Sequence, residues 1–292
     1  MHAVAQFVGE KGRNATEYHD NDFDWKSCVV DGENAVARQR EEYQKSEGCF
    51  SGQVERTGYS WEDFHHSHST GRFFKEKRYL PIAFPRLKET YESRMHVIGE
   101  IGCGCGSALI PVLRENPDAV AVACDVSPTA IEFFHSICAD AGIDRERVQL
   151  SVHAAGTGSG VSPFEVQSLD TMMIIFTLSA FHPNDMQCVL KESYMALKDG
   201  GVVVFRDYGL YDMAQLRFHG NQLVDESHLV YRRGDGTLSN FFSVEFLEGE
   251  FQKAGFSTIE CRYVTTYVRN AKKNVTMKRV YIHGEFQKRI YS

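Results

Sequence analysis

Apolar and polar positions of this chain alternate between strand-like and helix-like patterns from residue 96 onward. Five short apolar or β-branched runs predict strands, at residues 96–101, 119–124, 148–152, 169–178 and 202–206. Apolar residues at helical spacing predict helices at residues 107–113, 128–141, 184–198 and 244–254. Strands that alternate with helices are typical of a parallel sheet with helices on both faces.

The last part of the chain follows a different pattern. Runs at 258–268 and 277–285 flank the polar residues 270–274, which predicts two antiparallel strands joined as a hairpin. The predicted fold is therefore α/β, with seven strands in a mostly parallel sheet and a C-terminal antiparallel hairpin. This arrangement is typical of Rossmann-like sheets, among them the class I methyltransferase fold. The insertion at 207–239 has no clear period and predicts no regular element.

Three regions are predicted along the chain. Residues 1–55 are polar, with no sustained period except near 35–45, so we expect a flexible extension that contains one helix. Residues 56–95 are aromatic and basic, with one helix that begins at Trp61 and runs toward residues 73–80, and another at 84–93. Residues 96–292 form the α/β domain.

A glycine motif follows the first predicted strand of that domain. Glu100 is followed by Gly102, Gly104 and Gly106 at alternate positions. A dinucleotide-binding loop needs Gly-x-Gly-x-x-Gly, so this spacing argues against a nicotinamide oxidoreductase. The pattern is the one expected around S-adenosylmethionine. Asp125 ends the second strand, where a carboxylate accepts hydrogen bonds from ribose hydroxyls; a glycine-rich turn without a ligand is the alternative.

Other candidate residues lie at the predicted carboxyl ends of the strands, where ligands of such sheets bind. Ala154 ends the third strand and Ile175 lies at the exit of the fourth. The fifth strand ends in Arg206, Asp207 and Tyr208, which could stack on a planar substrate and hydrogen-bond to it. A salt bridge between Arg206 and Asp207 that only shapes a loop is the alternative.

Composition and charge restrict the possible domain organisation and function only slightly. The chain has 292 residues, 42% of them hydrophobic, and a net charge of −7, which predicts one large domain with appendages and offers no global electrostatic argument for nucleic acid. Basic residues nevertheless concentrate at 72–94 and 262–289. These segments could follow a phosphate backbone or could be solvated strand faces, and charge alone leaves both open.

The cysteines and histidines indicate no metal site and no secretion. Eight cysteines occur without a Cys-x-x-Cys pair, which favours reduced thiols inside the cell. The spacing of His65, His66 and His68 fits no common zinc pattern. No apolar run approaches the length of a membrane span, and residues 1–21 have no signal-peptide core. We therefore expect no metal, no membrane association, and a cytoplasmic or nuclear location.

Several sequence blocks resemble a known family. They are the aromatic and basic block that begins at Trp61 and includes residues 73–78, the glycine motif at 100–106, and the segments 124–132, 175–183, 205–212 and 231–237. Over about residues 58–286 the chain is similar to the eukaryotic tRNA 3-methylcytidine methyltransferases.

This resemblance implies a function. It suggests an S-adenosylmethionine-dependent enzyme that forms 3-methylcytidine in the anticodon loop of tRNA, with S-adenosylhomocysteine as the product. It also suggests a tRNA-binding protein partner, such as a tRNA synthetase. The implied cofactor-binding residues are Trp61, His65, Gly102, Gly104, Gly106, Asp125, Ala154 and Ile175.

The chain departs from the family at two of these positions. His65 stands where relatives commonly have Tyr, and Ala154 stands where relatives have an Asp that would meet the adenine amino group. Loss of one charge-assisted hydrogen bond would weaken cofactor binding by about 1.5–3 kcal/mol unless His153 or the Gly/Ser loop after it substitutes.

Ring nitrogen 3 of cytidine has a free lone pair, so the predicted chemistry needs placement rather than a strong base. We expect Tyr208 to stack on the base and Asp207 to accept a hydrogen bond from its exocyclic amine. Arg206 would hold Asp207 or contact phosphate. The alternatives are a methyltransferase that acts on a small molecule or a protein, and a catalytically weak or inactive tRNA-binding scaffold subunit.

Overall fold

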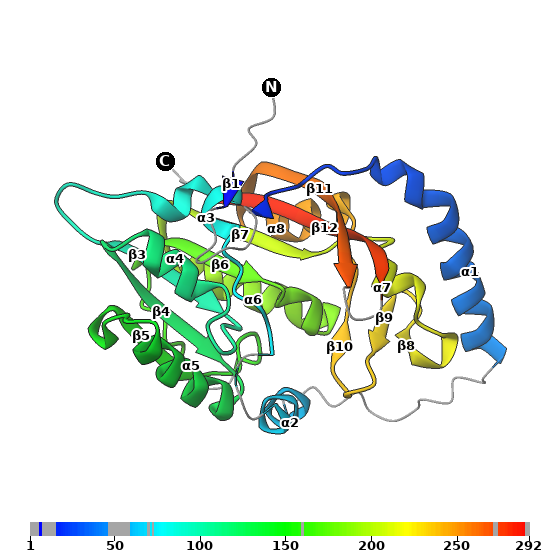
Figure 1. The fold of residues 1–292 in the computed structure, drawn as a ribbon, viewed down its shortest axis with the longest axis horizontal. Coiled ribbons are helices and arrows are strands. Elements are labelled where there is room, and N and C mark those ends of the chain that lie inside the picture. The colour runs from blue at the N-terminus through cyan, green and yellow to red at the C-terminus, as the bar shows by residue number, and fades with distance from the viewer. Residues whose placement is uncertain are drawn as a thin grey trace.

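One seven-stranded sheet forms the centre of the computed structural model (Figure 1), which describes residues 6–7, 16–45, 59–68, 71, 73–158, 161–270 and 274–289. The strands lie in the order β11-β12-β7-β6-β3-β4-β5. Their bounds are β3 His96–Ile101, β4 Ala119–Asp125, β5 Val148–Val152, β6 Leu169–Ile175, β7 Leu197–Tyr208, β11 Phe256–Asn270 and β12 Val275–Lys288. Strands β3 to β7 are parallel, and β12 pairs antiparallel with both β7 and β11. The predicted fold class and terminal hairpin are confirmed.

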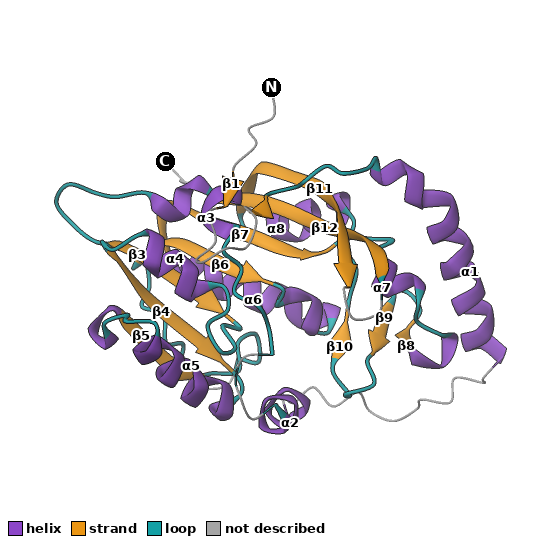
Figure 2. Cartoon of the chain, in the orientation of Figure 1, coloured by secondary structure: helices purple, strands orange, loops and turns teal. Residues whose placement is uncertain are grey.

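Helices cover the two faces of this sheet (Figure 2). One apolar cluster includes residues of α3 (Leu80–Ala83), α4 (Leu109–Glu115) and α5 (Pro128–Asp140), and the other includes residues of α6 (Pro183–Ala196) and α8 (Val244–Lys253). All seven residues of β6 are buried. A strand covered on both faces reads as a continuous apolar run, which is why the sequence predicted it.

Two predicted element boundaries are wrong. Helix α6 ends at Ala196 rather than at residue 198, and residues 197–201 belong to β7 because Leu197 already pairs with Leu169 of β6. The pairing is irregular there, and Gly200 takes a positive φ of 77°. The predicted strand 169–178 ends at Ile175, since Phe176 has a φ of 56° and the turn η4 (Leu178–Ala180) follows.

The predicted helix at 84–93 is also wrong. Only the 3-10 turn η2 (Pro85–Lys88) forms there. The main-chain carbonyl oxygens that would continue a helix accept side-chain hydrogen bonds instead: Asn116 Nδ2 donates to Leu87 O at 3.1 Å and to Glu89 O at 3.0 Å. The helix that was expected to run from Trp61 toward residues 73–80 is α2 (Tyr59–Ser67), which ends earlier.

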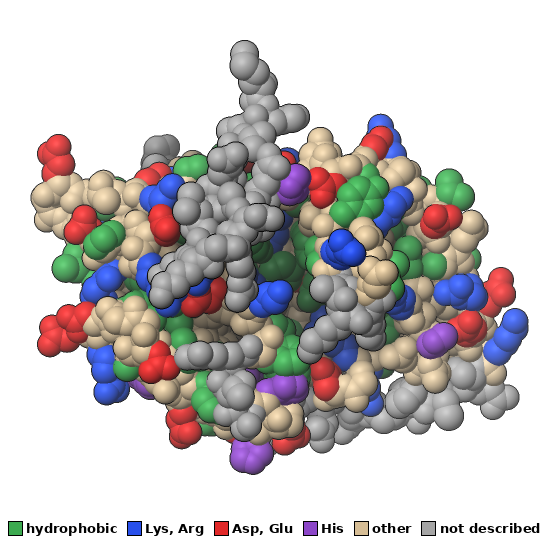
Figure 3. Space-filling model, viewed as in Figure 1, with side chains coloured by type: hydrophobic (Ala, Val, Ile, Leu, Met, Phe, Trp, Pro, Cys, Tyr) green, Lys and Arg blue, Asp and Glu red, His purple; other side chains and the backbone are tan. Residues whose placement is uncertain are grey.

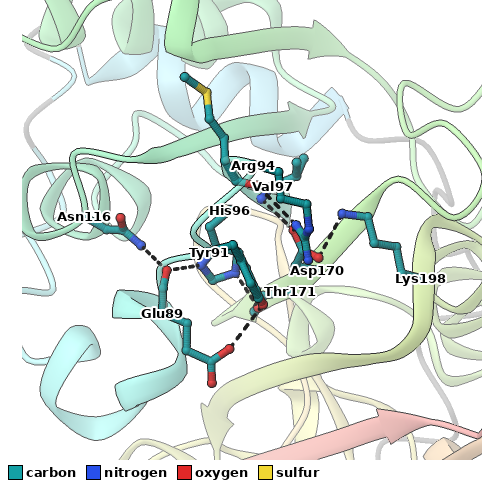
Figure 4. Close-up of polar contacts among 10 residues, drawn as sticks. Glu89, Tyr91, Arg94, His96, Val97, Asn116, Asp170, Thr171 and Lys198 are labelled. Atoms are coloured by element: carbon teal, nitrogen blue, oxygen red, sulfur yellow. Dashed lines mark hydrogen bonds and ion pairs between the residues drawn. The ribbon is translucent and has the colours of Figure 1, made fainter.

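A polar cluster stabilises the amino ends of the central strands, at the opposite end of the sheet from the predicted site (Figure 4). Asp170 on β6 pairs with Arg94 at 2.6 Å and with Lys198 at 2.9 Å, and it accepts a hydrogen bond from Val97 N at 2.9 Å. Although burial opposes ionisation, these bonds lower the pKa of Asp170. The cluster therefore stabilises the fold and is not part of the predicted site.

The insertion at 207–239 contains regular structure that was not predicted. It holds α7 (Met213–Leu216), the turn η5 (Gly220–Gln222) and a three-stranded antiparallel sheet. The strands of that sheet are β8 (Leu223–Asp225), β9 (Val230–Arg232) and β10 (Leu238–Ser239). Strands of two or three residues are too short to produce a recognisable alternation.

The N-terminal residues 18–45 pack on the domain, which differs from the flexible extension that the sequence predicted. The turn η1 (Trp25–Cys28) leads into α1 (Val29–Lys45), which begins before the predicted helix and lies beside β8, α7 and the turn η5 (Figure 1). The Gln39 side chain donates to Gln215 O and Phe218 O, both at 2.9 Å. Before η1, Asp22 N donates to Thr265 O of the edge strand β11 at 2.9 Å.

Two short strands precede this segment, β1 (Gln6–Phe7) and β2 (Thr16–Glu17), and they pair with one another. The remaining residues of the predicted extension, 1–5, 8–15 and 46–55, lie outside the described residues. None of the helices in the described ranges is long and apolar enough to cross a membrane.

Candidate active site

A cavity of about 1110 Å³ opens at the carboxyl ends of the parallel strands. Most of the predicted site residues line it: Trp61, His65, Gly102, Gly104, Gly106, Asp125, Ala154, Ile175 and Tyr208. Arg206 and Asp207 do not. The structure therefore brings the predicted cofactor-binding residues together in one cavity. Of the three predicted polar residues at the tip of the fifth parallel strand, β7, only Tyr208 reaches this cavity.

The glycine loop after β3 needs its glycines for space and conformation. Gly102, Gly104 and Gly106 have φ values of 69°, 51° and 83°. A Cβ atom on Gly102 would lie 2.3 Å from the Thr177 side chain, and one on Gly106 would lie 2.5 Å from the Phe134 ring. No larger residue adopts this path without displacing its neighbours.

Asp125 at the end of β4 fixes the loop to the next helix. Its Oδ2 accepts a hydrogen bond from Gly104 N at 2.8 Å, and its Oδ1 accepts one from Ser127 N at 3.0 Å. Ser127 in turn caps α5, since its side chain accepts from Ala130 N at 3.0 Å. Burial raises the pKa of Asp125, and the two backbone hydrogen bonds oppose that shift. A carboxylate at the end of the second strand is the group that accepts hydrogen bonds from ribose hydroxyls in sheets that bind nucleotides.

Helix α2 covers one side of the cavity. Trp61 and His65 line the wall from this helix, and burial lowers the pKa of His65. Glu62, which sequence analysis did not single out, accepts hydrogen bonds from Ser127 Oγ and Thr129 Oγ1, both at 2.5 Å, and from Thr129 N at 3.2 Å. The carboxylate thus attaches α2 to the N-terminus of α5, where the helix dipole favours negative charge.

Lys77 and Glu100 form a second polar wall beside the glycine loop. Lys77 Nζ donates to Ser107 Oγ at 2.6 Å, and Glu100 is 1% exposed. Burial lowers the pKa of Lys77 and raises the pKa of Glu100, and each charge partly offsets the shift of the other. Among the described residues, no hydrogen bond reaches Glu100 Oε2. Sequence analysis did not assign Lys77 to the site, although it belongs to the predicted aromatic and basic block.

The far end of the cavity is aromatic. Phe176, Tyr208 and Tyr281 lie with ring centroids 5.2 to 6.2 Å apart. The guanidinium of Arg279 is 5.6 Å from the Tyr208 ring centroid and 5.2 Å from that of Tyr281, and the guanidinium of Arg233 is 5.6 Å from the Tyr208 ring. Rings and guanidinium planes in this arrangement can stack on a nucleobase.

Arg279 and Tyr281 were not predicted as site residues. Tyr281 of β12 is the register partner of Tyr208 on β7, so the antiparallel hairpin places both residues at this end of the cavity. Arg279 is held by the fully buried Asp212, with Nε donating to Oδ2 at 2.8 Å. Strand alternation alone could not show which of the basic residues at 262–289 reaches the site.

Asp207 lies beneath the cavity rather than on its wall. It is fully buried; its Oδ2 accepts from Ser179 N at 2.9 Å and its Oδ1 from Tyr208 N at 2.8 Å. Burial raises the pKa of Asp207 to about 6. The carboxylate therefore contacts two backbone amides that position wall residues.

Arg206 does not pair with Asp207, which corrects the predicted salt bridge. Adjacent strand residues point to opposite faces of a sheet, and Arg206 is buried on the other face. It donates to the Tyr18 hydroxyl at 2.8 Å and lies 3.4 Å from His283 Nδ1.

Many residues of the two basic segments have acidic partners inside the protein. Arg262 pairs with Asp20 at 3.0 Å, Arg86 with Glu285 at 3.5 Å, and Arg94 and Arg279 pair as described above. For these basic residues, the contacts favour the interpretation that they belong to the surfaces of strands and loops and do not follow a phosphate backbone. Acidic and basic side chains are interspersed over the face shown in Figure 3. Arg72, Lys272 and Lys273 lie outside the described residues.

Within the described ranges, no group of three or more His, Cys, Asp or Glu side chains is arranged to hold a metal ion.

Comparisons with known proteins agree with this geometry. A family model described as a methyltransferase domain matches residues 100–203. The human tRNA N(3)-cytidine methyltransferase METTL6 is 36% identical over 231 residues, which cover 78% of this chain and 79% of the relative. The Drosophila melanogaster tRNA N(3)-methylcytidine methyltransferase Mettl2 is 35% identical over 234 residues, covering 78% of this chain and 70% of the relative.

Solved structures resemble the chain in fold. A SAM-dependent methyltransferase from Methanosarcina mazei has a TM-score of 0.53 at 16% identity and covers 69% of this chain and 96% of its own. Another, from Anabaena variabilis, has a TM-score of 0.55 at 12% identity and covers 80% and 95%.

Proposed function

This chain belongs to the tRNA N(3)-cytidine methyltransferase family, and from that premise we propose that it transfers a methyl group from S-adenosylmethionine to ring nitrogen 3 of a cytidine in tRNA. One observation carries the proposal: a single cavity joins the glycine loop and Asp125 to the aromatic end formed by Phe176, Tyr208 and Tyr281. The two ends are suited to the methyl donor and to the base that accepts the methyl group.

The residues at the glycine end fit this cofactor. Glu100 presents a buried oxygen with no hydrogen-bond partner among the described residues, which suits the amino group of the methionine part. Asp125 would hold the ribose, and Trp61 and His65 would close the pocket from α2. The bound cofactor would supply a methyl group on a positively charged sulfur. We propose that the walls of this cofactor pocket are formed by Gly102, Gly104, Gly106, Ala154 and Ile175.

The aromatic end would receive the cytosine. A base in a tRNA loop can be unstacked at a cost of a few kcal/mol and then stacked on aromatic side chains. Tyr208 and Tyr281 would flank the base, while the guanidinium groups of Arg233 and Arg279 would stack or contact phosphate. Nitrogen 3 of cytosine is not protonated at neutral pH, so holding it in line with the methyl group is the main catalytic task.

Asp207 and Arg206 would act on this end indirectly. Asp207 holds the amides of Ser179 and Tyr208, so we propose it as a positioning residue and not as a group that contacts the base. Arg206 would stabilise the opposite face of β7 through Tyr18 and His283.

The substrate would be the anticodon stem-loop of tRNA, and a tRNA-binding protein such as a synthetase would be a plausible source of further affinity. We propose that the reaction takes place in the cytoplasm or nucleus; the seven cysteines among the described residues are unpaired, which supports a reducing compartment.

Methylation of bulk tRNA by the purified chain tests the proposal. The protein is incubated with methyl-labelled S-adenosylmethionine and tRNA, alone and with a candidate partner, and the nucleosides are analysed by mass spectrometry. Labelled 3-methylcytidine is expected. Label in another nucleoside, in protein or in a small molecule, or no label despite tRNA binding, would overturn the assignment.

A further inference from the structure

His153 has a defined orientation that the proposed roles do not yet use. It follows directly after β5, and its main-chain N–H donates to Asp125 O at 2.9 Å. The side chain is 10% exposed, and the residue lines the cavity next to Ala154 and Ala155. A largely buried imidazole beside two small residues adds a polar group to this part of the wall.

Glu192 of α6 holds the imidazole in place. His153 Nε2 lies 2.8 Å from Glu192 Oε1, and Ser162 Oγ donates to the same oxygen at 2.7 Å. Gly156 N donates to Glu192 Oε2 at a longer 3.4 Å. One carboxylate on a rigid helix therefore organises both the imidazole and the loop that follows it.

The contact with Glu192 also decides which ring nitrogen can accept a hydrogen bond. The carboxylate accepts this hydrogen bond, so Nε2 carries a hydrogen, and in the tautomer with hydrogen on Nε2 alone the lone pair lies on Nδ1. Among the described residues, no hydrogen bond is made to His153 Nδ1. The wall thus offers an acceptor that a second residue fixes in one tautomer.

The topology places this acceptor where a nucleoside base would lie. Asp125 at the end of β4 is positioned for ribose hydroxyls, and the aromatic end of the cavity lies on the β6 and β7 side. In S-adenosylmethionine the base and the sulfur are attached at opposite sides of the ribose. A ribose at Asp125 with the methyl group toward the aromatic end would therefore direct the base toward β5, the neighbour of β4 on the other side.

We propose that His153, oriented by Glu192, accepts a hydrogen bond from the exocyclic amine of the cofactor's adenine. This inference rests on the proposed use of S-adenosylmethionine. His153 is then a cofactor-binding residue and Glu192 a positioning residue. Asp185, which lines the same wall from the first turn of α6, is the competing acceptor.

Binding of two product analogues by calorimetry tests the proposal without any reaction. S-adenosyl-L-homocysteine carries the amine, whereas S-inosyl-L-homocysteine has a carbonyl oxygen in its place. The wild-type chain should bind the inosyl compound about tenfold more weakly, as expected for one lost hydrogen bond. His153→Ala should bind the adenosyl compound about tenfold more weakly and the inosyl compound with nearly unchanged affinity.

Four further variants complete the design. His135→Ala, on α5 and away from the cavity wall, should bind both compounds like the wild type. Glu192→Ala should also weaken adenosyl binding, and a double variant of Glu192 and His153 should be no weaker than His153→Ala, since the two residues act as a unit. Asp185→Asn should leave the preference for the adenosyl compound intact. Thermal unfolding of each variant confirms that it is folded.

The outcomes separate the two proposals. If the wild-type chain binds neither compound, the use of this cofactor is wrong. If the wild type binds the adenosyl compound but His153→Ala binds it equally well, or loses both compounds equally, the role of His153 is wrong. Loss of the adenosyl preference in Asp185→Asn alone would assign the contact to Asp185.

Discussion

His283 shows how a buried side chain of this protein is fixed in one protonation state. Its ring stacks on Phe84 with centroids 4.2 Å apart, and Nδ1 lies 3.4 Å from the Arg206 guanidinium. Burial, together with the positive charges of Arg206 and Arg262, lowers the pKa of His283 to about 2, although Glu260 lies 3.6 Å from Nε2. The imidazole is therefore neutral throughout the range in which the protein functions.

This neutrality predicts a loss of stability in acid. Below about pH 6.5 the unfolded chain takes up a proton at this residue and the folded chain does not, so the free energy of unfolding falls by about 1.4 kcal/mol per pH unit. Between about pH 7.5 and about pH 4.5, His283 therefore lowers the free energy of unfolding by about 3 kcal/mol. In His283→Asn, urea denaturation should show a pH dependence that is shallower by this amount; equal slopes in variant and wild type would contradict the prediction.

Asp207 illustrates a buried acid that positions its neighbours. Asp207→Ala leaves the amides of Ser179 and Tyr208 without their acceptor, at a cost of about 1–3 kcal/mol for each. We expect a lower free energy of unfolding in urea and at least a tenfold loss of tRNA methylation, because the Tyr208 ring loses its support. Tyr208→Phe, which keeps the ring, should retain most of the activity. Full activity of Asp207→Ala would show that Tyr208 needs no such support.

At the scale of elements, α2 is a single short helix attached over the cavity largely by one carboxylate. The ring of Phe64, which is 7% exposed, adds an apolar contact with Phe73 and Phe74. Glu62 supplies the bonds to α5. Since Trp61 and His65 reach the cavity from this helix, its attachment should govern cofactor affinity.

Glu62→Ala should therefore weaken binding of S-adenosylhomocysteine by about 5- to 20-fold, the equivalent of one or two hydrogen bonds. Amide hydrogen exchange at residues 59–67 should become faster, while exchange in β6 should not change. Glu132→Ala removes an exposed acid from α5 and serves as the matched control. Unchanged exchange in α2 of Glu62→Ala would mean that the Phe64 contacts are sufficient.

The elements that could be predicted are those whose signal is local. The β6 run and the glycine loop each carry their pattern within a few residues. The end of α6 was misplaced because pairing of Leu197 with Leu169 overrides the helix end predicted at residue 198. The three short strands at 223–239 were missed because they exist only through pairing with one another.

At the scale of the whole molecule, the cofactor half of the cavity was predictable and the aromatic half only in part. Residues 96–125 form one strand–helix–strand unit, so Gly102 and Asp125 meet at the ends of two neighbouring strands, β3 and β4. Tyr281 and Arg279 meet Tyr208 only because β12 inserts beside β7. The pattern of apolar and polar residues at 275–288 does not indicate that this strand pairs with β7.

The N-terminal segment stabilises this arrangement from outside the sheet. Trp25 stacks on Tyr263 with centroids 4.1 Å apart and on Tyr211 at 5.8 Å, and its Nε1 donates to Leu210 O at 3.0 Å. Trp25→Ala should lower the free energy of unfolding by about 2–4 kcal/mol, measured by urea denaturation. Val30→Ala, at a position that is 68% exposed, should change it by less than about 0.5 kcal/mol. A loss below about 1 kcal/mol in Trp25→Ala would mean that residues 18–45 dock only loosely.

Strand β12 has a consequence for biosynthesis. It pairs with β7 on one side and β11 on the other, yet it leaves the ribosome after every other strand of the sheet. Until it emerges, β7 presents a row of unpaired amides and carbonyls, which is the kind of edge that recruits foreign strands. The nascent protein should thus need chaperone protection late in translation, and a premature stop before residue 275 should yield an insoluble product instead of a weakened enzyme.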